Sequence, residues 1–404
     1  MSGPFESWQR PPLWRGAGAP ACCGAPGPLP YSFTPCHGRP SAVTTGPTSS
    51  LHAVASRPRR WLAALLGILA ALPAWAQAPA PTSLRIVGGL AGVNQFTRHE
   101  EPFWTQELPR LSGGKLRADI VAFDRAGIRG QDMLRLMQLG VVPFGTALLS
   151  LSSGSEPLLA APDLAGMNPD IAHLKRHAAA FRPYLDKLLR ERHGVELLAI
   201  YIYPAQMLFC KRGFTGLSEL GGRRIRTSSP TQADWVEALG ATPVTTSFAE
   251  LNQSLRTGHV DCAITGSMSG YTIGLHELTT HLSPMPVSWG MAVFGANAGA
   301  WQALAADQRS MLKQELMRLE QSIWAEAERE TGEGVRCVSG AQPCGGRDAG
   351  RMTIVPPAPA DELRRRSVFA GQVLPRWVQR CGGTCAEAWN QTIAPVIGVE
   401  AKPQ

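Results

Sequence analysis

Near the middle of the chain, residues 222–226 read Gly-Arg-Arg-Ile-Arg, residues 248–251 read Phe-Ala-Glu-Leu and residues 258–261 read Gly-His-Val-Asp. This pattern predicts a short buried strand that ends in Arg226, then an amphipathic helix, then a second strand that starts at Val260. An arginine at the end of a buried strand is costly unless an anion meets it, and its planar guanidinium suits a carboxylate well. The stretch therefore predicts a site that binds a small organic acid.

Strands and helices alternate on both sides of this stretch. The hydrophobic pattern predicts strands over 83–88, 116–123, 141–149, 195–203, 207–211, 223–227, 242–244 and 260–265. It predicts helices over 99–111, 130–139, 171–191, 231–239, 248–257 and 301–330, with two more helical segments after Arg351. Such alternation is typical of an α/β protein with mainly parallel pairing, and 404 residues are enough for two domains.

The N-terminal part has the features of an export signal. Residues 1–56 are rich in Pro, Gly, Ser and Ala, and we expect them to be disordered or to precede the true start. Residues 57–76 combine basic residues, an apolar run and an Ala-Trp-Ala cleavage site, which together predict a secretory signal peptide. An uncleaved N-terminal anchor is the competing interpretation, although the run is short for a membrane span. We expect the mature chain to begin at Gln77.

Cysteine usage agrees with export. The cysteines beyond the predicted cleavage site are even in number: Cys210, Cys262, Cys337, Cys344, Cys381 and Cys385. An even number in an exported chain predicts disulfides, whose connectivity the sequence does not fix. Cys337 with Cys344, and Cys381 with Cys385, are each spaced to close a short loop. A zinc site is the alternative, but the spacing does not match a ribbon or a finger and no histidine lies near.

Several function classes lack support in the sequence. The net charge of +8 comes largely from arginines in the N-terminal segment, so we expect no nucleic-acid partner. We find no G-x-S-x-G, no phosphate-binding loop and no dinucleotide motif after a strand. The histidines that we considered are scattered, without the spacing of metal ligands. We therefore expect no enzyme activity, no cofactor and no metal.

Together the motifs resemble the DctP family of periplasmic solute-binding proteins, which serve TRAP (tripartite ATP-independent periplasmic) transporters. The resemblance runs from about Leu84 to about Glu330, through motifs that occur in the family's order. These motifs are Ser112-Gly-Gly-Lys-Leu116, Met133-Leu134 followed by Gly140, Gly194-Val-Glu-Leu-Leu198, Leu217-Ser-Glu-Leu-Gly-Gly-Arg-Arg-Ile-Arg226, Leu239-Gly-Ala-Thr-Pro-Val244, Phe248-Ala-Glu250 and Gly258-His-Val-Asp261.

The resemblance implies a two-lobed periplasmic binding protein fold, with crossing hinge strands and a long interdomain helix. Lobe I is then expected to hold residues 81–205 and 290–335. Lobe II is expected to hold residues 206–289 and 336–404, including the C-terminal helices. Ligand is expected to bind in the cleft between the lobes, which close over it by a hinge motion.

The resemblance also assigns site residues. The family's carboxylate-binding arginine falls on Arg226, with a surface ion pair as the alternative. Phe248 falls where the family places an aromatic residue against the ligand, with a plain core aromatic as the alternative. Thr265 stands where an asparagine is usual, and Gln206 stands where many members have a second arginine.

The first-strand exit is apolar here, at Leu90-Ala91, and Leu148 replaces an acidic position. Trp289 is expected either in the wall of the site or in the core. These departures predict a cleft that is less charged than a sugar-acid or dicarboxylate site. We expect the ligand to be a monocarboxylate with an apolar or aromatic body.

Two functions from different classes follow. In the first, the protein is the extracytoplasmic, periplasmic solute-binding subunit of a TRAP transporter. It is then a monomer that delivers its ligand to the small and large membrane subunits. In the second, it is an exported ligand-binding or sensory protein that is no longer coupled to transport. The replacement of the family's Glu-Asn pair by Ile264-Thr265 gives the second interpretation its weight.

Overall fold

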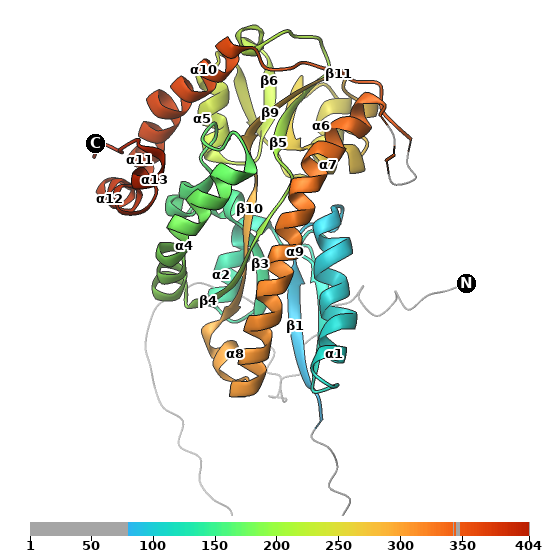
Figure 1. Ribbon diagram of the computed structural model, residues 1–404, viewed down its shortest axis with the longest axis vertical. Helices are drawn as coiled ribbons and strands as arrows, with labels where there is room; N and C mark the ends of the chain where they lie inside the picture. The colour runs from blue at the N-terminus through green and yellow to red at the C-terminus, as the bar shows by residue number, and fades with distance from the viewer. Residues whose placement is uncertain (1–79, 342, 345–347, 404) are drawn as a thin grey trace, which may run out of the picture. The chain divides into compact units, whose positions relative to one another are not determined.

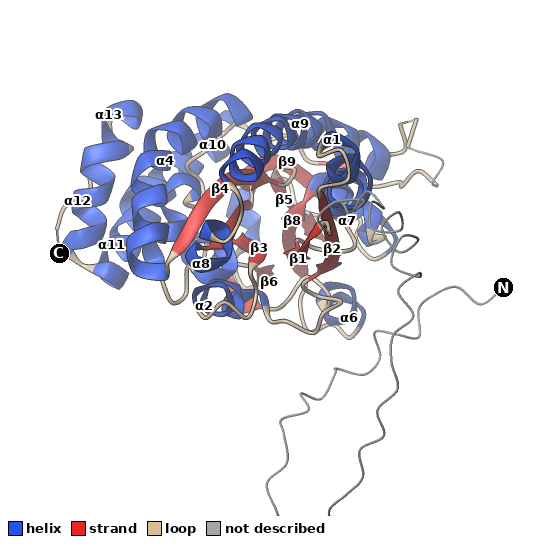
Figure 2. Ribbon diagram, turned by 90° about the horizontal axis from the view of Figure 1, so that it is seen from below, coloured by secondary structure: helices blue, strands red, loops and turns tan. Residues whose placement is uncertain are grey.

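Two β-sheets organise the part of the chain that the structure describes. The structure is a computed structural model that describes residues 80–341, 343–344 and 348–403 (Figure 1). The predicted signal peptide and residues 1–56 lie outside the described residues. The α/β class predicted from the sequence is confirmed, and the strands lie at the centre with α4, α8 and α9 around them (Figure 2).

The first sheet has five strands in the order β2-β1-β3-β10-β4. They are β1 (Thr82–Gly88), β2 (Leu116–Ala122), β3 (Phe144–Leu148), β4 (Val195–Ile202) and β10 (Met291–Asn297). The helical segments that belong to this half of the sequence are Gln95–Glu100, Phe103–Glu107, α1 (Leu108–Leu111), Gly130–Asp132, α2 (Met133–Gln138), α3 (Leu149–Ser152), Pro157–Asp163, α4 (Ile171–His193) and α8 (Ala298–Gln302).

The second sheet has six strands in the order β11-β9-β5-β8-β6-β7. They are β5 (Gln206–Cys210), β6 (Arg224–Thr227), β7 (Thr242–Thr245), β8 (Cys262–Gly266), β9 (His281–Ser288) and β11 (Thr353–Ile354). Its helical segments are Leu217–Leu220, α5 (Pro230–Ala238), α6 (Leu251–Arg256), α7 (Ser267–Thr272) and Leu275–Glu277.

Two chain segments run through both sheets side by side. The first passes from β4 directly into β5, and the second returns from β9 directly into β10. β4 pairs with β10 and β5 pairs with β9, both antiparallel, and Tyr203 N donates to Gly290 O at 3.1 Å where the two segments cross. Pairing is therefore mixed rather than mainly parallel, because a segment that returns beside another must run antiparallel to it.

The long helix α9 (Ala306–Ser339) packs against elements of both sheets (Figure 1). It contacts β4 of the first sheet and α7, which follows β8 of the second. β4 is an edge strand, and α9 supplies hydrogen-bond partners to its exposed backbone. Ile200 N donates to Glu320 Oε2 at 2.9 Å, and Trp324 Nε1 donates to Ile200 O at 2.8 Å. These contacts fix the helix to the sheet edge.

The C-terminal helices also contact both halves. They are α10 (Pro359–Val368), the helical turn Phe369–Val373, α11 (Leu374–Cys381), α12 (Gly383–Thr392) and α13 (Ala394–Ile397). Asp361 accepts the backbone N–H of Leu217, whereas α12 and α13 pack against α4. The lobe boundaries expected from the resemblance stay a prediction.

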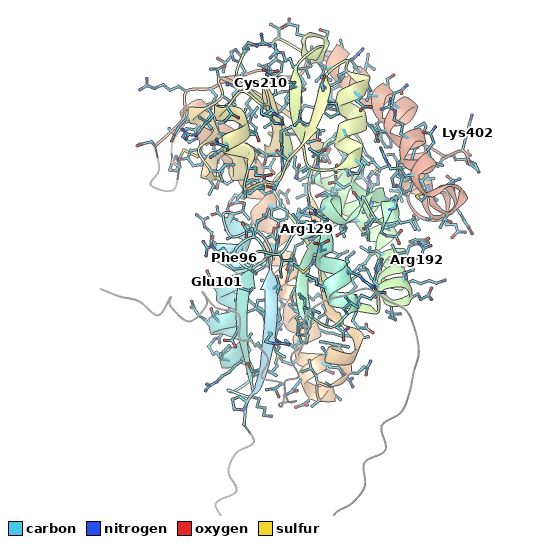
Figure 3. All side chains as sticks on the ribbon, turned by 180° about the vertical axis from the view of Figure 1, so that it is seen from behind. Phe96, Glu101, Arg129, Arg192, Cys210 and Lys402 are labelled. Atoms are coloured by element: carbon cyan, nitrogen blue, oxygen red, sulfur yellow. A yellow bond between two sulfur atoms is a disulfide. The ribbon has the colours of Figure 1, made fainter. Side chains whose placement is uncertain are left out.

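Three disulfides join the cysteines that the sequence singled out. Cys210 pairs with Cys262, Cys337 with Cys344, and Cys381 with Cys385. Cys210 (labelled in Figure 3) lies opposite Cys262 on the antiparallel strands β5 and β8, so this disulfide joins two neighbouring strands of the second sheet. The other two close short loops, as their spacing predicted.

Candidate ligand-binding site

A cavity of about 570 Å³ lies between the two sheets, a volume that suits a small molecule. Residues of both sheets and of both crossing segments line it. From the side of the first sheet these include Leu90, Phe123, Asp124, Ile128, Arg129 (labelled in Figure 3), Leu148, Ser150 and Leu151. From the second sheet and the crossings they include Tyr203, Gln206, Arg226, Ser228, Thr246, Ser247, Phe248, Glu250, Thr265 and Gly290.

Arg226 places a buried positive charge in this cavity. Its residue is only 3% exposed; its Nε donates to Thr246 O at 3.0 Å and its Nη1 donates to Ile264 O at 2.9 Å. No carboxylate of the described residues pairs with it. Burial alone lowers the pKa of Arg226 to about 10, so the guanidinium stays charged at neutral pH. A buried cation held only by carbonyls creates a strong local demand for an anion.

The neighbouring arginines have other partners. Arg224 pairs with Asp261 at 3.0 Å on the surface, and Arg223 donates to three backbone carbonyls. Two carboxylates also line the cavity, and both are exposed residues that accept local backbone hydrogen bonds. Asp124 accepts from Ala91 N and Glu250 accepts from Ser247 N.

Much of the remaining wall is apolar. Leu90, Phe123 and Leu148 are buried and line the cavity from the first sheet. Phe248 lines it from the second sheet, half-buried in the loop that precedes α6. The predicted helix over 248–257 begins only at Leu251, which leaves Phe248 in that loop. The apolar groups offer contact area to a hydrocarbon body.

Polar groups of β5 and β8 complete the wall. Thr265 is buried on β8 and lines the cavity. Gln206 lines it from the first position of β5 and is hydrogen-bonded to Gln232 of α5 at 2.7 Å. Gln232 also bonds Ser288 of β9 at 2.8 Å. Sequence reasoning missed Gln232 and Ser288, because only the folded chain brings them to Gln206.

Trp289 is not among the residues that line the cavity. It is 2% exposed, and its indole Nε1 donates to Asn168 O at 3.2 Å. Asp163, which the sequence did not single out, accepts the backbone N–H groups of Trp289 and Gly290, each at 2.9 Å. Burial raises the pKa of Asp163 to about 6 despite these hydrogen bonds. This carboxyl fixes the crossing where the second segment passes between the sheets.

Glu100 is a second buried carboxyl, and it lies beside the loop that follows the first strand, β1. It is fully buried, and it accepts hydrogen bonds from Gly89 N at 3.1 Å and from Thr146 Oγ1 at 2.7 Å. Burial raises the pKa of Glu100 to about 7, since desolvation outweighs the hydrogen bonds that favour the carboxylate. Gly89 precedes Leu90, so Glu100 positions the loop that carries this part of the apolar wall.

The comparison with known families agrees with this geometry. Residues 96–336 match the family model described as "Bacterial extracellular solute-binding protein, family 7", named DctP. The chain belongs to this DctP family. The predicted resemblance is confirmed, and the motifs around Arg226 and Phe248 lie within the part of the chain that matches the family. Within the described ranges, no helix has the length and apolarity of a membrane span, and no group of His, Cys, Asp and Glu is arranged to hold a metal ion.

Solved structures share the DctP fold with this chain. An extracytoplasmic solute receptor of Bordetella pertussis that binds pyroglutamic acid matches at 21% identity with a TM-score of 0.69, covering 77% of this chain and 99% of its own. A TRAP periplasmic solute-binding protein of Desulfovibrio salexigens with bound orotic acid matches at 15% identity, TM-score 0.67, covering 76% and 96%. One of Shewanella oneidensis with bound succinate matches at 19% identity, TM-score 0.63, covering 76% and 98%. The two-lobed fold expected from the sequence is confirmed.

Proposed function

We propose that this protein is the extracytoplasmic solute-binding receptor of a TRAP transporter and that it captures a small organic acid in the cavity between its sheets. The observation that carries the proposal is Arg226, a buried guanidinium that lines the cavity and has no carboxylate partner among the described residues. A ligand carboxylate supplies the missing anion, and the planar guanidinium bonds it in a fork. The solved neighbours with pyroglutamic acid, orotic acid and succinate all hold carboxylic acids, which supports this class of ligand.

The wall of the cavity favours a monocarboxylate with an apolar body. Leu90, Leu148 and Phe248 face the space beside Arg226, whereas Gln206 is neutral at the position where the resemblance expects a second arginine. A second carboxylate placed beside Gln206 would be buried without a free cation, because Arg129, which also lines the cavity, is exposed and already paired with Asp132 at 2.7 Å. An apolar body instead buries its surface against the two leucines and the phenylalanine.

The two segments that cross between the sheets can act as a hinge, and hinge motion would allow the protein to deliver its ligand to the transporter. Because the sheets are joined at Tyr203 and Gly290, a small change of backbone angles there moves one sheet relative to the other. We propose that ligand binding closes the cavity and that the closed form docks on the small and large membrane subunits in the periplasm. The ligand is released unchanged, so the protein has no chemistry of its own.

An exported sensory protein is the second candidate, and Thr265 favours it. The hydroxyl of Thr265 offers less hydrogen bonding than the family's asparagine at this position. A receptor uncoupled from transport still binds its ligand but does not support uptake. Growth on the identified acid as sole carbon source, with and without the gene, separates the two functions.

The proposal is tested by expressing the full chain in a Gram-negative host and recovering it from the periplasm. Mass spectrometry of the released ligand, with a thermal-shift screen of organic acids, is expected to identify a carboxylate that stabilises the protein. Absence of both a bound acid and a stabilising acid, across monocarboxylates, dicarboxylates and sugar acids, contradicts the proposal.

A further inference from the structure

A chain of hydrogen bonds fixes the orientation of two side-chain amides beside the cavity. The backbone N–H of Ser228 donates to Gln232 Oε1 at 2.8 Å. A backbone N–H can only donate, so the oxygen of the Gln232 amide must face Ser228. The nitrogen of that amide then faces the other way, where Nε2 donates to Gln206 Oε1 at 2.7 Å and to Ser288 Oγ at 2.8 Å. Gln232 is 1% exposed, which holds this arrangement away from water.

The fixed amide of Gln232 determines what Gln206 offers to a ligand. Because Gln206 Oε1 accepts from Gln232, its Nε2 carries two hydrogens that have no acceptor among the described residues. Gln206 and Gly290 both line the cavity, and Nε2 lies so close to Gly290 that a Cβ atom there would come within 2.5 Å of it. The amide nitrogen therefore occupies the space that the glycine leaves open. The lining thus includes two donors of different charge, the Arg226 guanidinium and the neutral Gln206 amide.

We propose that Gln232 positions Gln206 as a neutral hydrogen-bond donor, so that the ligand is a monocarboxylate with a neutral acceptor, a keto or amide carbonyl or a hydroxyl, at its other end. This inference rests on the proposed function, since it assumes that the cavity binds an acid at Arg226. A plain alkanoate leaves the Gln206 amide without an acceptor. A dicarboxylate brings a second charge that the neutral amide does not balance.

The ligand test compares acids of one chain length that differ at a single position. The probes are pentanoate, 4-oxopentanoate, 4-hydroxypentanoate and glutarate, with hexanoate, 5-oxohexanoate and adipate for a longer span. Calorimetric titration of the full chain, after any bound ligand is removed, measures each affinity. The oxo acid of one length is expected to bind about tenfold tighter than the alkanoate and than the dicarboxylate of that length, the effect of one buried hydrogen bond.

Two variants then test whether the preference for oxo acids depends on the side-chain amides of Gln206 and Gln232. Gln206→Met keeps the side-chain length but removes the donor, so the ratio of the oxo-acid affinity to the alkanoate affinity should fall from about ten to about one. In Gln232→Glu, one carboxylate oxygen still accepts from Ser228 N. The other oxygen accepts from Ser288 Oγ and forces Gln206 to turn and donate to it. Gln206 then presents its carbonyl to the cavity.

Gln232→Glu is therefore expected to lower affinity for 4-oxopentanoate about tenfold relative to 4-hydroxypentanoate, since only the hydroxyl can donate. Measurement at mildly alkaline pH keeps the new carboxyl ionised, and the ratio of two ligands cancels the general effect of its charge. A merely structural role of Gln232 would weaken both ligands equally and would leave this ratio unchanged.

The outcomes separate this inference from the proposed function. Binding of oxo acids with the expected preference, lost in Gln206→Met and reversed toward the hydroxy acid in Gln232→Glu, supports the inference. Equal affinity for oxo acids and alkanoates, tighter binding of dicarboxylates, or an unchanged oxo-to-hydroxy ratio in Gln232→Glu overturns it while the proposed function stands. If none of these or any other organic acid binds, the proposed function itself is wrong.

Discussion

The guanidinium of Arg226 on β6 donates to the carbonyl oxygen of Ile264 on β8, 2.9 Å away. This bond and the one to Thr246 O hold the charged group at the wall of the cavity without neutralising it. Only neutral carbonyl groups therefore hold this charge in place among the described residues.

Removing the guanidinium is expected to abolish tight binding. Arg226→Met should weaken binding of the native acid by about 2–4 kcal/mol, because a desolvated carboxylate loses its charged partner. Arg226→Lys should also weaken binding, since an ammonium group does not reproduce the planar fork. Isothermal titration calorimetry measures both. The control is Arg224→Met, which removes an exposed arginine of the same strand, and its affinity should match that of the wild type.

The Arg226→Met substitution should not destabilise the ligand-free protein. Arg226 is buried without an acid partner, so its replacement by an apolar side chain relieves a desolvated charge. We expect the thermal midpoint of ligand-free Arg226→Met to rise above that of the wild type. A lower midpoint would mean that Arg226 mainly supports the fold.

Gly290 is expected to be required for ligand binding as well as for the left-handed backbone conformation at this position. Its φ is 74°, and a Cβ atom there would come within 2.5 Å of Gln206 Nε2. Gly222, with φ 73° and open space around it, is the matched control. Both glycine-to-alanine variants should lose about 1 kcal/mol of stability from the left-handed backbone, but only Gly290→Ala should weaken ligand binding. Equal affinities of the two variants would contradict the close approach of Gln206.

Glu100 predicts a pH dependence of stability. Burial raises the pKa of this carboxyl from 4.5 to about 7, so between these values the folded state binds more protons than the unfolded state. The free energy of unfolding should then fall as pH rises from 4.5 to 7, by about 3 kcal/mol from this group. Chemical denaturation across this range measures it. Glu100→Gln should flatten the profile, whereas Glu107→Gln, at an exposed residue, should leave it unchanged.

Asp163 should also make the free energy of unfolding fall as pH rises, but over a lower pH range than Glu100. Its pKa rises from 3.8 to about 6, so it lowers the free energy of unfolding as pH rises between those values. The Asp163→Asn variant should flatten the acidic part of the profile and leave the part near pH 7 to Glu100. If the wild-type profile rises from pH 4.5 to pH 7 in spite of both groups, their burial does not control stability in this range.

The Cys210–Cys262 disulfide should contribute more stability than Cys337–Cys344. The first closes a sequence separation of 52 residues and the second one of 7. On the chain-entropy model these loops correspond to about 4 and about 2 kcal/mol. Replacing both cysteines of one pair by alanine, and comparing unfolding midpoints in denaturant, measures the difference. A larger loss from the short loop would show that packing at the cysteines outweighs loop entropy.

The sequence alone determined most of the strands and helices, because their signals are local. Apolar residues recur with the period of a strand or a helix, and glycines such as Gly194 end helices at fixed places. The motifs from Ser112 to Asp261, taken together, were enough to indicate the DctP family. The strands β9 and β10 and the loop position of Phe248 were not predicted. The mixed pairing was not predicted either, because it joins segments far apart in the chain and leaves no local period.

The inner arrangement of the site was decided only by the tertiary structure. Gln206, Ser228, Gln232 and Ser288 lie on different elements, and nothing near any one of them in the sequence indicates that their amides and hydroxyls meet. Likewise, Trp289 could belong to the wall or to the core until packing placed its indole against Asn168 O. A residue's type and its immediate neighbours predict whether it is buried, but its hydrogen-bond partners depend on strand order and helix packing, which join residues far apart in the chain.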